Sequence, residues 1–255
     1  MLLPRITPCL LIHNNGLVKT MEFKTPKYVG DPINAVKIFN EKEVDELIIL
    51  DIDASVNNLE PNYKMIAKLA AECRMPLCYG GGIKSLKQAK HIISLGVEKI
   101  AISSAALEDD FIISNIANEL GSQSVVVALD VRKKSTLFAS TYKIYTHNAE
   151  RAHKNDLMEF IKYIEDSGAG EILINSIDND GQMRGYDVLL AKQIQKEINI
   201  PMTFLGGAGS LEDMQMLIKE CGTIGVAAGS IFVFKGKYKA VLISYPNREE
   251  RKPIY

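Results

Sequence analysis

Gly80-Gly81-Gly82 is the stretch that decides the fold, because it has a second version at Gly206-Gly207-Ala208-Gly209. Each version follows a short apolar run and precedes an amphipathic segment that opens with Ser-Leu, at Ser85 and at Ser210. This order predicts a strand, a tight turn and a helix start. Glycines in such a turn let the backbone approach a ligand closely, and the free N–H groups of a new helix favour an anion.

The similarity between the two turns extends into the sequence on either side of them. Residues 47–53 and 172–178 precede the turns, and residues 100–105 and 226–231 follow them. The chain is therefore two similar halves, and we predict two phosphate sites on one face of a symmetric barrel. The residues predicted to line them are Gly81, Gly82, Ser103, Ser104, Gly206, Gly207, Gly229 and Ser230. The alternative is that the glycines only close βα units.

Short apolar runs alternate with helical patterns along the whole chain. The predicted strands are residues 6–12, 46–51, 76–79, 99–102, 125–130, 171–176, 201–205 and 225–228. The predicted helices are residues 31–40, 62–72, 85–95, 109–120, 156–167, 187–198, 210–221 and 237–244. This alternation is typical of a parallel sheet closed into a barrel. We predict an α/β fold, a (β/α)8 TIM barrel with an internal half-barrel repeat, as a single domain over residues 1–255.

The composition argues against several other classes of protein. The net charge is −1, so a general nucleic-acid or membrane surface is not expected. No apolar stretch approaches the roughly 20 residues that span a bilayer, and the N-terminus shows no signal-peptide pattern. The cysteines, at positions 9, 73, 78 and 221, have no CxxC spacing and are predicted to be buried thiols. We expect a cytoplasmic protein with no metal site and no cofactor.

Two connections are longer than the others. One covers residues 13–30 after the first strand, and the other covers residues 131–155 after the fifth, where residues 137–145 alternate like a small hairpin. Both follow the carboxyl ends of their strands, which is the face where such barrels place their active sites. Long loops there are often functional lids, although they can also be decoration.

Side-chain alternation along the strands indicates which residues point into the barrel. On this pattern Arg5, Glu46, Lys99 and Glu171 lie on inward faces near the start of their strands. Two of these residues are positive and two are negative, and charges in a core are costly unless they are paired. We predict a closed ring of ion pairs at the bottom of the barrel. The alternative is that the four residues face solvent at the lower rim.

At the upper end of the barrel the same alternation selects a second set of inward residues. They are Leu11, Leu50, Ser103, Asp130, Asn175 and Leu205. Asp130 is the only ionisable member and ends its strand, so we predict that it is catalytic; a helix or loop cap is the alternative. Four further aspartates at strand ends are predicted to lie on the rim, where they cap loops or bind substrate hydroxyls: Asp51, Asp53, Asp178 and Asp180.

These residues give the chain a close resemblance to the HisF family, the cyclase subunit of imidazole glycerol phosphate synthase. The resemblance extends from Arg5 to about Phe234. Its motifs are Asp51-Ile52, Gly80-Gly81-Gly82-Ile83, Gly121-Ser122-Gln123, Val125–Asp130, Gly168-Ala169-Gly170-Glu171, Ser176-Ile177-Asp178, Asp180-Gly181, Gly185-Tyr186-Asp187 and Gly206-Gly207-Ala208-Gly209. The resemblance implies a half-barrel-duplicated (β/α)8 barrel and a small-molecule substrate that carries two phosphates.

The resemblance also implies a partner and a route for ammonia. In the family, a HisH-like glutaminase docks on the N-terminal face of the barrel and sends ammonia through it. Arg5, Glu46, Lys99 and Glu171 match the family's charged gate at the channel entrance. Lys19 matches a residue of its mobile active-site loop, and the glycine and serine turns match its phosphate-binding turns.

One departure from the family pattern bears directly on the chemistry. The cyclases use two aspartates, on the first and fifth strands, as an acid–base pair. Asp130 matches the second aspartate, but the first falls on Leu11, and Leu205 replaces a small polar residue before the second glycine turn. General acid–base catalysis contributes about 10²–10⁴-fold to a rate. We therefore expect weak or absent cyclase activity.

The chain is also similar to a branch of HisF-like proteins in acetamidino-sugar synthesis for bacterial surface glycans. Residues 16–20 and 28–32 carry this similarity. The branch implies ammonia transfer to a sugar acceptor, with a separate sugar amidotransferase as a further partner. One alternative is a histidine-pathway cyclase that uses Asp130 with a second acid, such as Asp51 or Asp178. Another is a phosphate-binding barrel that has lost both partner and chemistry.

Overall fold

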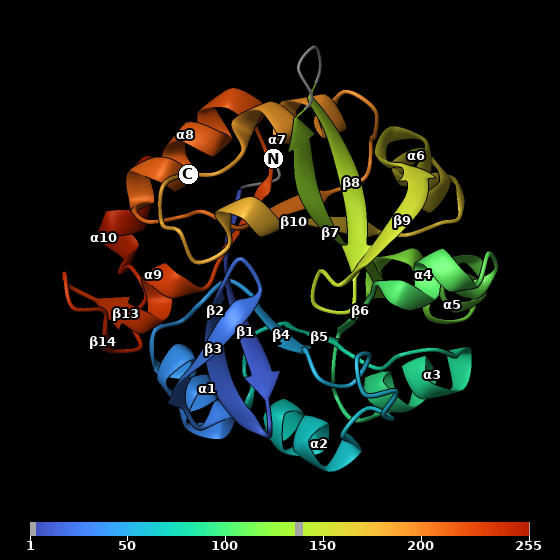
Figure 1. The fold of residues 1–255 in the computed structure, drawn as a ribbon. Helices are drawn as coiled ribbons and strands as arrows, with labels where there is room; N and C mark the ends of the chain where they lie inside the picture. Colours follow the sequence, from blue (N-terminus) through green and yellow to red (C-terminus); the bar gives the residue numbers. More distant parts are fainter. Residues whose placement is uncertain (1–3, 136–139, 255) are drawn as a thin grey trace.

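Parallel strands close into a barrel that is surrounded by helices (Figure 1). The computed structural model describes residues 4–135 and 140–254. The barrel strands, in order around the barrel, are β1 (Arg5–His13), β4 (Leu47–Asp51), β5 (Leu77–Gly80), β6 (Lys99–Ile102), β7 (Val125–Ser135), β10 (Glu171–Ser176), β11 (Met202–Leu205) and β12 (Gly225–Ala228). Pairing of β7 with β10 and of β12 with β1 closes the ring. The predicted (β/α)8 barrel is confirmed.

The helices that cover the barrel begin where the sequence places capping residues. They are α1 (Pro32–Glu41), α2 (Tyr63–Glu72), α3 (Leu86–Ser94), α5 (Ile112–Leu120), α6 (Leu157–Asp166), α7 (Val188–Gln195) and α8 (Leu211–Cys221). Six of these helices have an N-cap side chain that accepts a hydrogen bond from a backbone N–H in the first turn of the helix. The capping residues are Asp31, Asn62, Ser85, Asp156, Asp187 and Ser210. Asp109 does not cap α5, because α4 (Ser104–Glu108) and the turn after it come first.

The barrel interior has its own apolar cluster, separate from the large core between the strands and the helices. Its members are Cys9, Ile48, Cys78, Ala101, Val126, Leu173, Leu205 and Ala227, with Leu11, Leu50 and Ala128 packed against them. These residues alternate along their strands with residues of the outer core, so the predicted inward faces are correct.

Each half of the barrel begins with a strand that continues into an antiparallel hairpin. In the first half β1 pairs with β2 (Gly16–Met21), which pairs with β3 (Lys24–Gly30). In the second half β7 pairs with β8 (Ser140–Thr146), which pairs with β9 (Arg151–Asp156). The first long connection is therefore sheet and not loop. The second connection is also an antiparallel sheet, but residues 140–145 of the predicted hairpin lie in one strand, β8, which pairs with β7 and β9. Residues 137–139 of that prediction lie outside the described residues.

The predicted helix over residues 237–244 is wrong. The chain there forms a small hairpin of β13 (Phe234–Lys235) and β14 (Ala240–Val241). Gly236 and Lys239 have φ of 72° and 48°, and the Lys239 N–H donates to the Gly236 carbonyl. That turn chemistry overrides the apolar spacing that suggested a helix. The remaining short elements are α9 (Ser230–Val233), α10 (Arg248–Arg251), η1 (Ser122–Ser124), η2 (Ile177–Asn179) and η3 (Lys252–Ile254).

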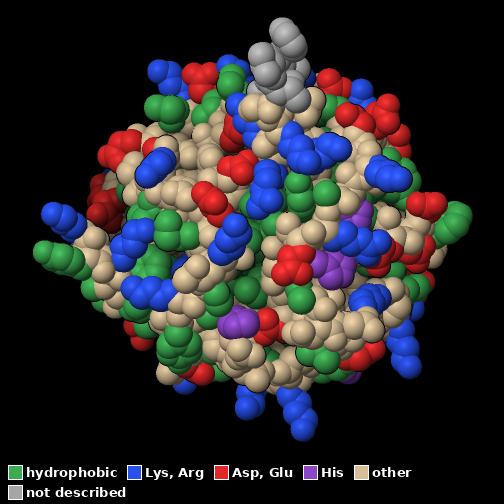
Figure 2. All heavy atoms as spheres, in the orientation of Figure 1, with side chains coloured by type: hydrophobic (Ala, Val, Ile, Leu, Met, Phe, Trp, Pro, Cys, Tyr) green, Lys and Arg blue, Asp and Glu red, His purple; other side chains and the backbone are tan. Residues whose placement is uncertain are grey.

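The surface charges and the burial of the cysteines test two expectations from the composition: a surface without a broad charged region, and buried thiols. Figure 2 shows Lys, Arg, Asp and Glu side chains mixed over the face in view, without a broad region of one sign. Cys9, Cys78 and Cys221 are buried thiols as predicted, whereas Cys73 is only half-buried. In the described ranges, no helix is long and apolar enough to cross a membrane.

Candidate active site and ion-pair ring

Two adjoining pockets lie at the carboxyl ends of the barrel strands. The N-half pocket, about 100 Å³, is lined by the first glycine turn and Ser103-Ser104; the C-half pocket, about 90 Å³, is lined by the second glycine turn and Gly229-Ser230. Asp130 and Asn148 line both pockets, so the two form one cleft. The structure thus places every residue of the predicted phosphate sites in this cleft: Gly81, Gly82, Ser103, Ser104, Gly206, Gly207, Gly229 and Ser230.

The glycine turns are also required for backbone packing. Gly81 and Gly207 have φ of 126° and 112°, in the region that favours glycine. A Cβ on Gly81 would lie 2.5 Å from the Asp51 carbonyl oxygen, and a Cβ on Gly207 would overlap the carbonyl oxygen of Gly185. Closing the βα units is therefore one role of these glycines, and lining the cleft is a second role of the same residues.

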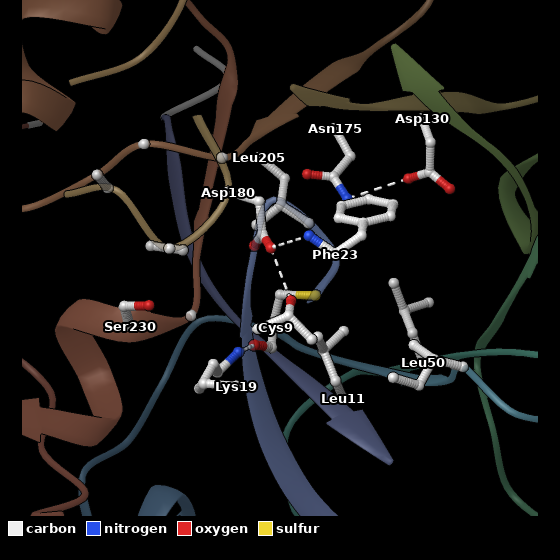
Figure 3. A pocket seen from close by; sticks show the side chains of 18 of the residues that line it. Cys9, Leu11, Lys19, Phe23, Leu50, Asp130, Asn175, Asp180, Leu205 and Ser230 are labelled. Carbon is white, nitrogen blue, oxygen red and sulfur yellow. Dashed lines mark hydrogen bonds between the residues drawn. The ribbon is translucent and has the colours of Figure 1, made fainter. Parts of the chain in front are cut away.

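Lys19 reaches the C-half pocket from β2. Its Nζ donates to the Cys9 carbonyl oxygen at 2.5 Å (Figure 3). A Cβ on Gly229 would overlap that Nζ. Lys19 is buried and forms no ion pair with a carboxylate within the described part of the chain. Burial lowers its pKa, while Cys9 and Asp180 oppose that shift. A buried amine beside an open glycine turn is well placed to meet an anion.

Asp130 stands at the centre of the cleft. The Asn175 amide Nδ2 donates to Asp130 Oδ1 at 3.0 Å. Burial raises the pKa of Asp130 to about 7, although the hydrogen bond from Asn175 lowers it and the charge of Asp180 adds to the rise. A carboxyl group with a pKa near neutrality can hold or release a proton at physiological pH.

Leu11 lines the cleft on the strand opposite Asp130, because β1 and β7 are four strands apart in the closed barrel. Leu50 and Leu205 line it too, and Figure 3 shows the side chains of Leu11 and Leu50 lying apart from the polar pair of Asp130 and Asn175. The position that would supply a second acid is therefore part of an apolar wall.

The prediction for Asp180 is wrong, because Asp180 lines the C-half pocket and does not lie on the outer rim. The η2 turn after β10 brings it back over the barrel, where its Oδ2 accepts from Thr20 Oγ1 at 2.6 Å and from the Phe23 N–H at 3.1 Å. Burial raises the pKa of Asp180, and these two hydrogen bonds lower it. Asp180 thus fastens the first hairpin over the pocket.

Asp51 also lines the cleft, on the side of the N-half pocket, so its predicted rim position is wrong too. Asp51, Asp53 and Asp178 all hold loops, as expected. Asp51 Oδ1 accepts from the N–H groups of Asp53 and Ala54 at 2.9 and 3.2 Å. Asp53 Oδ1 lies 2.6 Å from His13 Nδ1 at the base of the first hairpin. Asp178 Oδ2 accepts from the Lys133 N–H at 2.8 Å at the base of the second.

Arg5, Glu46, Lys99 and Glu171 form the predicted closed ring at the opposite end of the barrel. Arg5 Nη1 lies 3.2 Å from Glu46 Oε2, and Arg5 Nη2 lies 2.8 Å from Glu171 Oε1. Lys99 Nζ lies 2.6 Å from Glu46 Oε1 and 2.8 Å from Glu171 Oε2. Burial alone would lower the pKa of Lys99, but the two carboxylates raise it. Burial would raise the pKa of Glu171, but Arg5 and Lys99 lower it.

Several residues of the cleft were not found from the sequence. Phe23, Asn148 and His147 line it from the tips of the two hairpins. The sequence indicated these residues only through the length of the two connections. The alternation of side chains along a strand does not indicate where the tip of a hairpin points. Among the residues that the structure describes, there is no group of three or more His, Cys, Asp or Glu side chains that could hold a metal ion.

The fold and the cleft define a class of protein: closed (β/α)8 barrels of two similar halves, with paired pockets at the carboxyl ends of the strands. A family model described as "Histidine biosynthesis protein" matches residues 5–239. A Leptospira borgpetersenii protein named "Putative imidazole glycerol phosphate synthase subunit HisF" is 54% identical over the full length of both chains. A Vibrio vulnificus protein, named likewise as subunit hisF3, is 53% identical over 99% of this chain and 96% of its own.

A more distant relative has the same name without the word "Putative". The Lactococcus lactis protein named "Imidazole glycerol phosphate synthase subunit HisF" is 37% identical over 91% of this chain and 89% of its own. These matches, over nearly the whole of each chain, show that this chain belongs to the HisF family.

Proposed function

We propose that this protein is a HisF-type synthase subunit that receives ammonia from a HisH-like glutaminase and delivers it to a phosphorylated acceptor. Its relatives are named as subunits of imidazole glycerol phosphate synthase. The observation that carries the proposal is the order of three features along one barrel axis: a ring of four charges, an apolar interior, and a polar cleft at the far end.

The ion-pair ring supports an entrance for ammonia at the N-terminal face. Four charges at the mouth of an apolar core contribute little to stability, because their mutual attraction only roughly offsets the cost of burying them. A ring of two cations and two anions can, however, bind and orient small polar molecules and open by exchanging partners. We assign Arg5, Glu46, Lys99 and Glu171 as the ammonia gate on this basis.

The interior beyond the ring suits neutral ammonia. Its lining is mainly small or aliphatic, as in Cys9, Ala101, Val126 and Ala227. Thr203 lies beside the ring, and its hydroxyl donates to Glu171 Oε1 at 2.5 Å. An apolar lining excludes ammonium, because a charge costs far more to transfer than a small neutral molecule. The glutaminase would therefore have to release ammonia at the ring.

The cleft supports a phosphorylated acceptor. Each half offers a glycine turn and buried serine, and Lys19 places an amine against the Gly229 turn. Leu11 and Leu205 favour the branch that passes ammonia on to a sugar in acetamidino-sugar synthesis, because the chain then needs no acid–base pair of its own. That role would require a separate sugar amidotransferase.

A cyclase function is the second candidate, and the position of Asp180 favours it. Asp180 shares the C-half pocket with Asp130, and burial raises the pKa of both carboxyl groups. Asp180 joins Asp51 as a candidate for the second acid, because each lines a pocket together with Asp130 and burial raises the pKa of each, whereas Asp178 lines neither pocket.

The glutaminase part of the proposal is tested with the HisH-like glutaminase of the same organism. We expect this protein to raise its rate of glutamine hydrolysis when the two are mixed, because a partner on the ring face would complete the complex. Glutamine hydrolysis and size-exclusion chromatography are the measurements. A glutaminase that neither binds nor changes its rate would refute the proposed partnership.

The phosphate part has a separate test. Crystals soaked in inorganic phosphate should show anions near Gly82 and Ser104 and near Gly207 and Ser230. Lys19→Ala should remove or weaken only the second anion, because only that turn is in contact with Lys19. Density at neither turn in the unmodified protein would contradict the assignment. Lys19 is a better probe than Gly207, since a side chain on Gly207 collides with backbone.

A further inference from the structure

The hairpin of each half reaches a turn of the other half at the seam between the halves, where β1 pairs with β12 and β6 pairs with β7. Lys19 belongs to the hairpin of the first half, yet its amine lies at the Gly229 turn of the second half. If the repeat is functional, the hairpin of the second half should supply a polar side chain to the turns of the first half. The tip of the β8–β9 hairpin does this with His147.

His147 lines the N-half pocket together with Gly81, Gly82, Ser103 and Ser104. It is half-buried, and it does not line the C-half pocket. Figure 2 shows histidine side chains at the surface over the region of β8 and β9. His147 is thus a side chain that can carry a positive charge, and it contacts the same pocket as one predicted phosphate turn.

The backbone at this tip forms a left-handed turn that is tied to a neighbouring loop. His147, Asn148 and Ala149 have φ of 54°, 53° and 65°, so consecutive residues other than glycine adopt left-handed conformations. Asn148 Nδ2 donates to the Ile52 carbonyl oxygen at 3.1 Å, which ties the tip to the loop after β4. Tight turns between antiparallel strands commonly use such left-handed residues, as Asn14–Asn15 and Glu22–Phe23 also do, and at this turn His147 and Asn148 line the cleft.

A hydrogen-bond network fixes the imidazole ring. Thr146 is buried, and its Oγ1 lies 3.0 Å from His147 Nδ1 and 2.8 Å from His153 Nε2. Its single proton can be donated to only one of the two rings. When it is donated to His147 Nδ1, His147 carries its own proton on Nε2. The structure gives that Nε2 no partner among the described residues, so it can donate to a ligand.

We propose that His147 is a ligand-binding residue of the N-half pocket, where its Nε2–H donates to the anionic group that occupies the Gly81–Gly82 and Ser103–Ser104 turns. This rests on the proposed phosphate-binding cleft and deepens it. Lys19 then serves the C-half pocket and His147 the N-half pocket, each supplied by the hairpin of the other half. The two ends of a bis-anionic ligand are bound by different groups, which gives the ligand one orientation in a nearly symmetric barrel.

The test is a titration with inorganic phosphate, followed by backbone amide shifts in nuclear magnetic resonance spectra. Gly82 and Ser104 report on the N-half pocket, and Gly207 and Ser230 report on the C-half pocket. His147→Leu keeps much of the volume but has no donor, whereas His147→Gln keeps an N–H donor. A charge-assisted or well-placed hydrogen bond predicts about a tenfold or larger rise in the N-half Kd for His147→Leu. The C-half Kd should not change.

His153→Gln is the matched control, because His153 contacts Thr146 but does not line the pocket. We expect it to leave both Kd values within about twofold, a change of less than 0.5 kcal/mol by RT ln K. We also expect His147→Gln to recover part of the affinity. An N-half Kd unchanged in His147→Leu would overturn the proposal, and so would an equal loss in His153→Gln. Absence of phosphate shifts at both turns of the unmodified protein would instead refute the proposed cleft.

Discussion

Lys99→Ala is expected to destabilise the protein strongly and to uncouple it from its glutaminase. Glu46 and Glu171 are 4% and 7% exposed, and Lys99 Nζ forms ion pairs with Glu46 Oε1 and Glu171 Oε2. Without it, two buried carboxylates share Arg5, whose side chain is 34% exposed. Breaking a buried ion pair by removing one partner costs about 3–5 kcal/mol, because the remaining charge is left uncompensated. Because the ring lies at an open end of the barrel, we expect a loss of about 3 kcal/mol.

The loss is measured as a free energy of unfolding in urea. Lys192→Ala is the matched control, since Lys192 Nζ also contacts a carboxylate, Glu220 Oε2 at 2.7 Å, but both side chains are exposed. An exposed pair is worth about 0–1 kcal/mol. In the absence of urea, and at a temperature where Lys99→Ala is folded, activation of the glutaminase and transfer of its ammonia should both fall. If both stay at the level of the unmodified protein, the four residues are not the gate.

The ring shows what could be predicted from sequence. The four ring residues are far apart in the chain, but each stands at the start of an apolar strand: Arg5, Glu46, Lys99 and Glu171. Along such a strand, successive side chains point alternately into and out of the barrel. In a closed barrel that alternation fixes which side chains point inward, so four separate residues can be brought together without knowledge of any contact. The same reasoning placed Leu11 and Asp130 in the cleft correctly.

The hairpins show what could not be predicted. Asp180, Phe23 and His147 enter the cleft through turns whose direction depends on contacts between distant segments, such as Thr20 Oγ1 to Asp180 Oδ2. Histidine and asparagine are among the residues enriched in left-handed backbone, but His147-Asn148 alone does not specify which way the turn points. The incorrect prediction of a helix at residues 237–244 has a similar origin. The spacing of apolar residues suggested a helix, but a tight turn at Gly236 makes the chain form a hairpin.

Leu11 sets the limit on the chemistry that this cleft can perform alone. Asp130, with its pKa raised to about 7 by burial, can hold or release one proton. Across the barrel, Leu11 contributes to an apolar wall with Leu50 and Leu205. A sequence of ammonia addition and ring closure must both give and take protons, and an acid opposite Asp130 would be worth about 10²–10⁴-fold in rate. Asp180 holds the first hairpin through Thr20 and Phe23, so Asp130 alone can orient a ligand but cannot easily do both.

We therefore expect negligible conversion of the bisphosphate substrate of imidazole glycerol phosphate synthase when ammonia is supplied directly. Supplying ammonia in solution bypasses the glutaminase and so separates missing chemistry from a missing partner. Substrate loss and product formation are followed by absorbance and chromatography. Rapid turnover by the unmodified protein would refute the prediction and favour the cyclase function. In that case Asp180→Asn should abolish it, because Asp180 is the remaining acid of the C-half pocket.

If turnover is absent, Leu11→Asp decides between two explanations. The new carboxyl group would face Asp130 from the opposite strand, and circular dichroism would first show whether the variant folds, since a carboxylate buried against Leu50 and Leu205 is costly. Turnover in this variant would mean that only the acid had been lost. No turnover in a folded Leu11→Asp would mean that the pocket itself is remodelled. Leu205→Ser added to Leu11→Asp then tests the neighbouring position, and continued inactivity of that double variant would support a barrel that conducts ammonia to an acceptor bound by another enzyme.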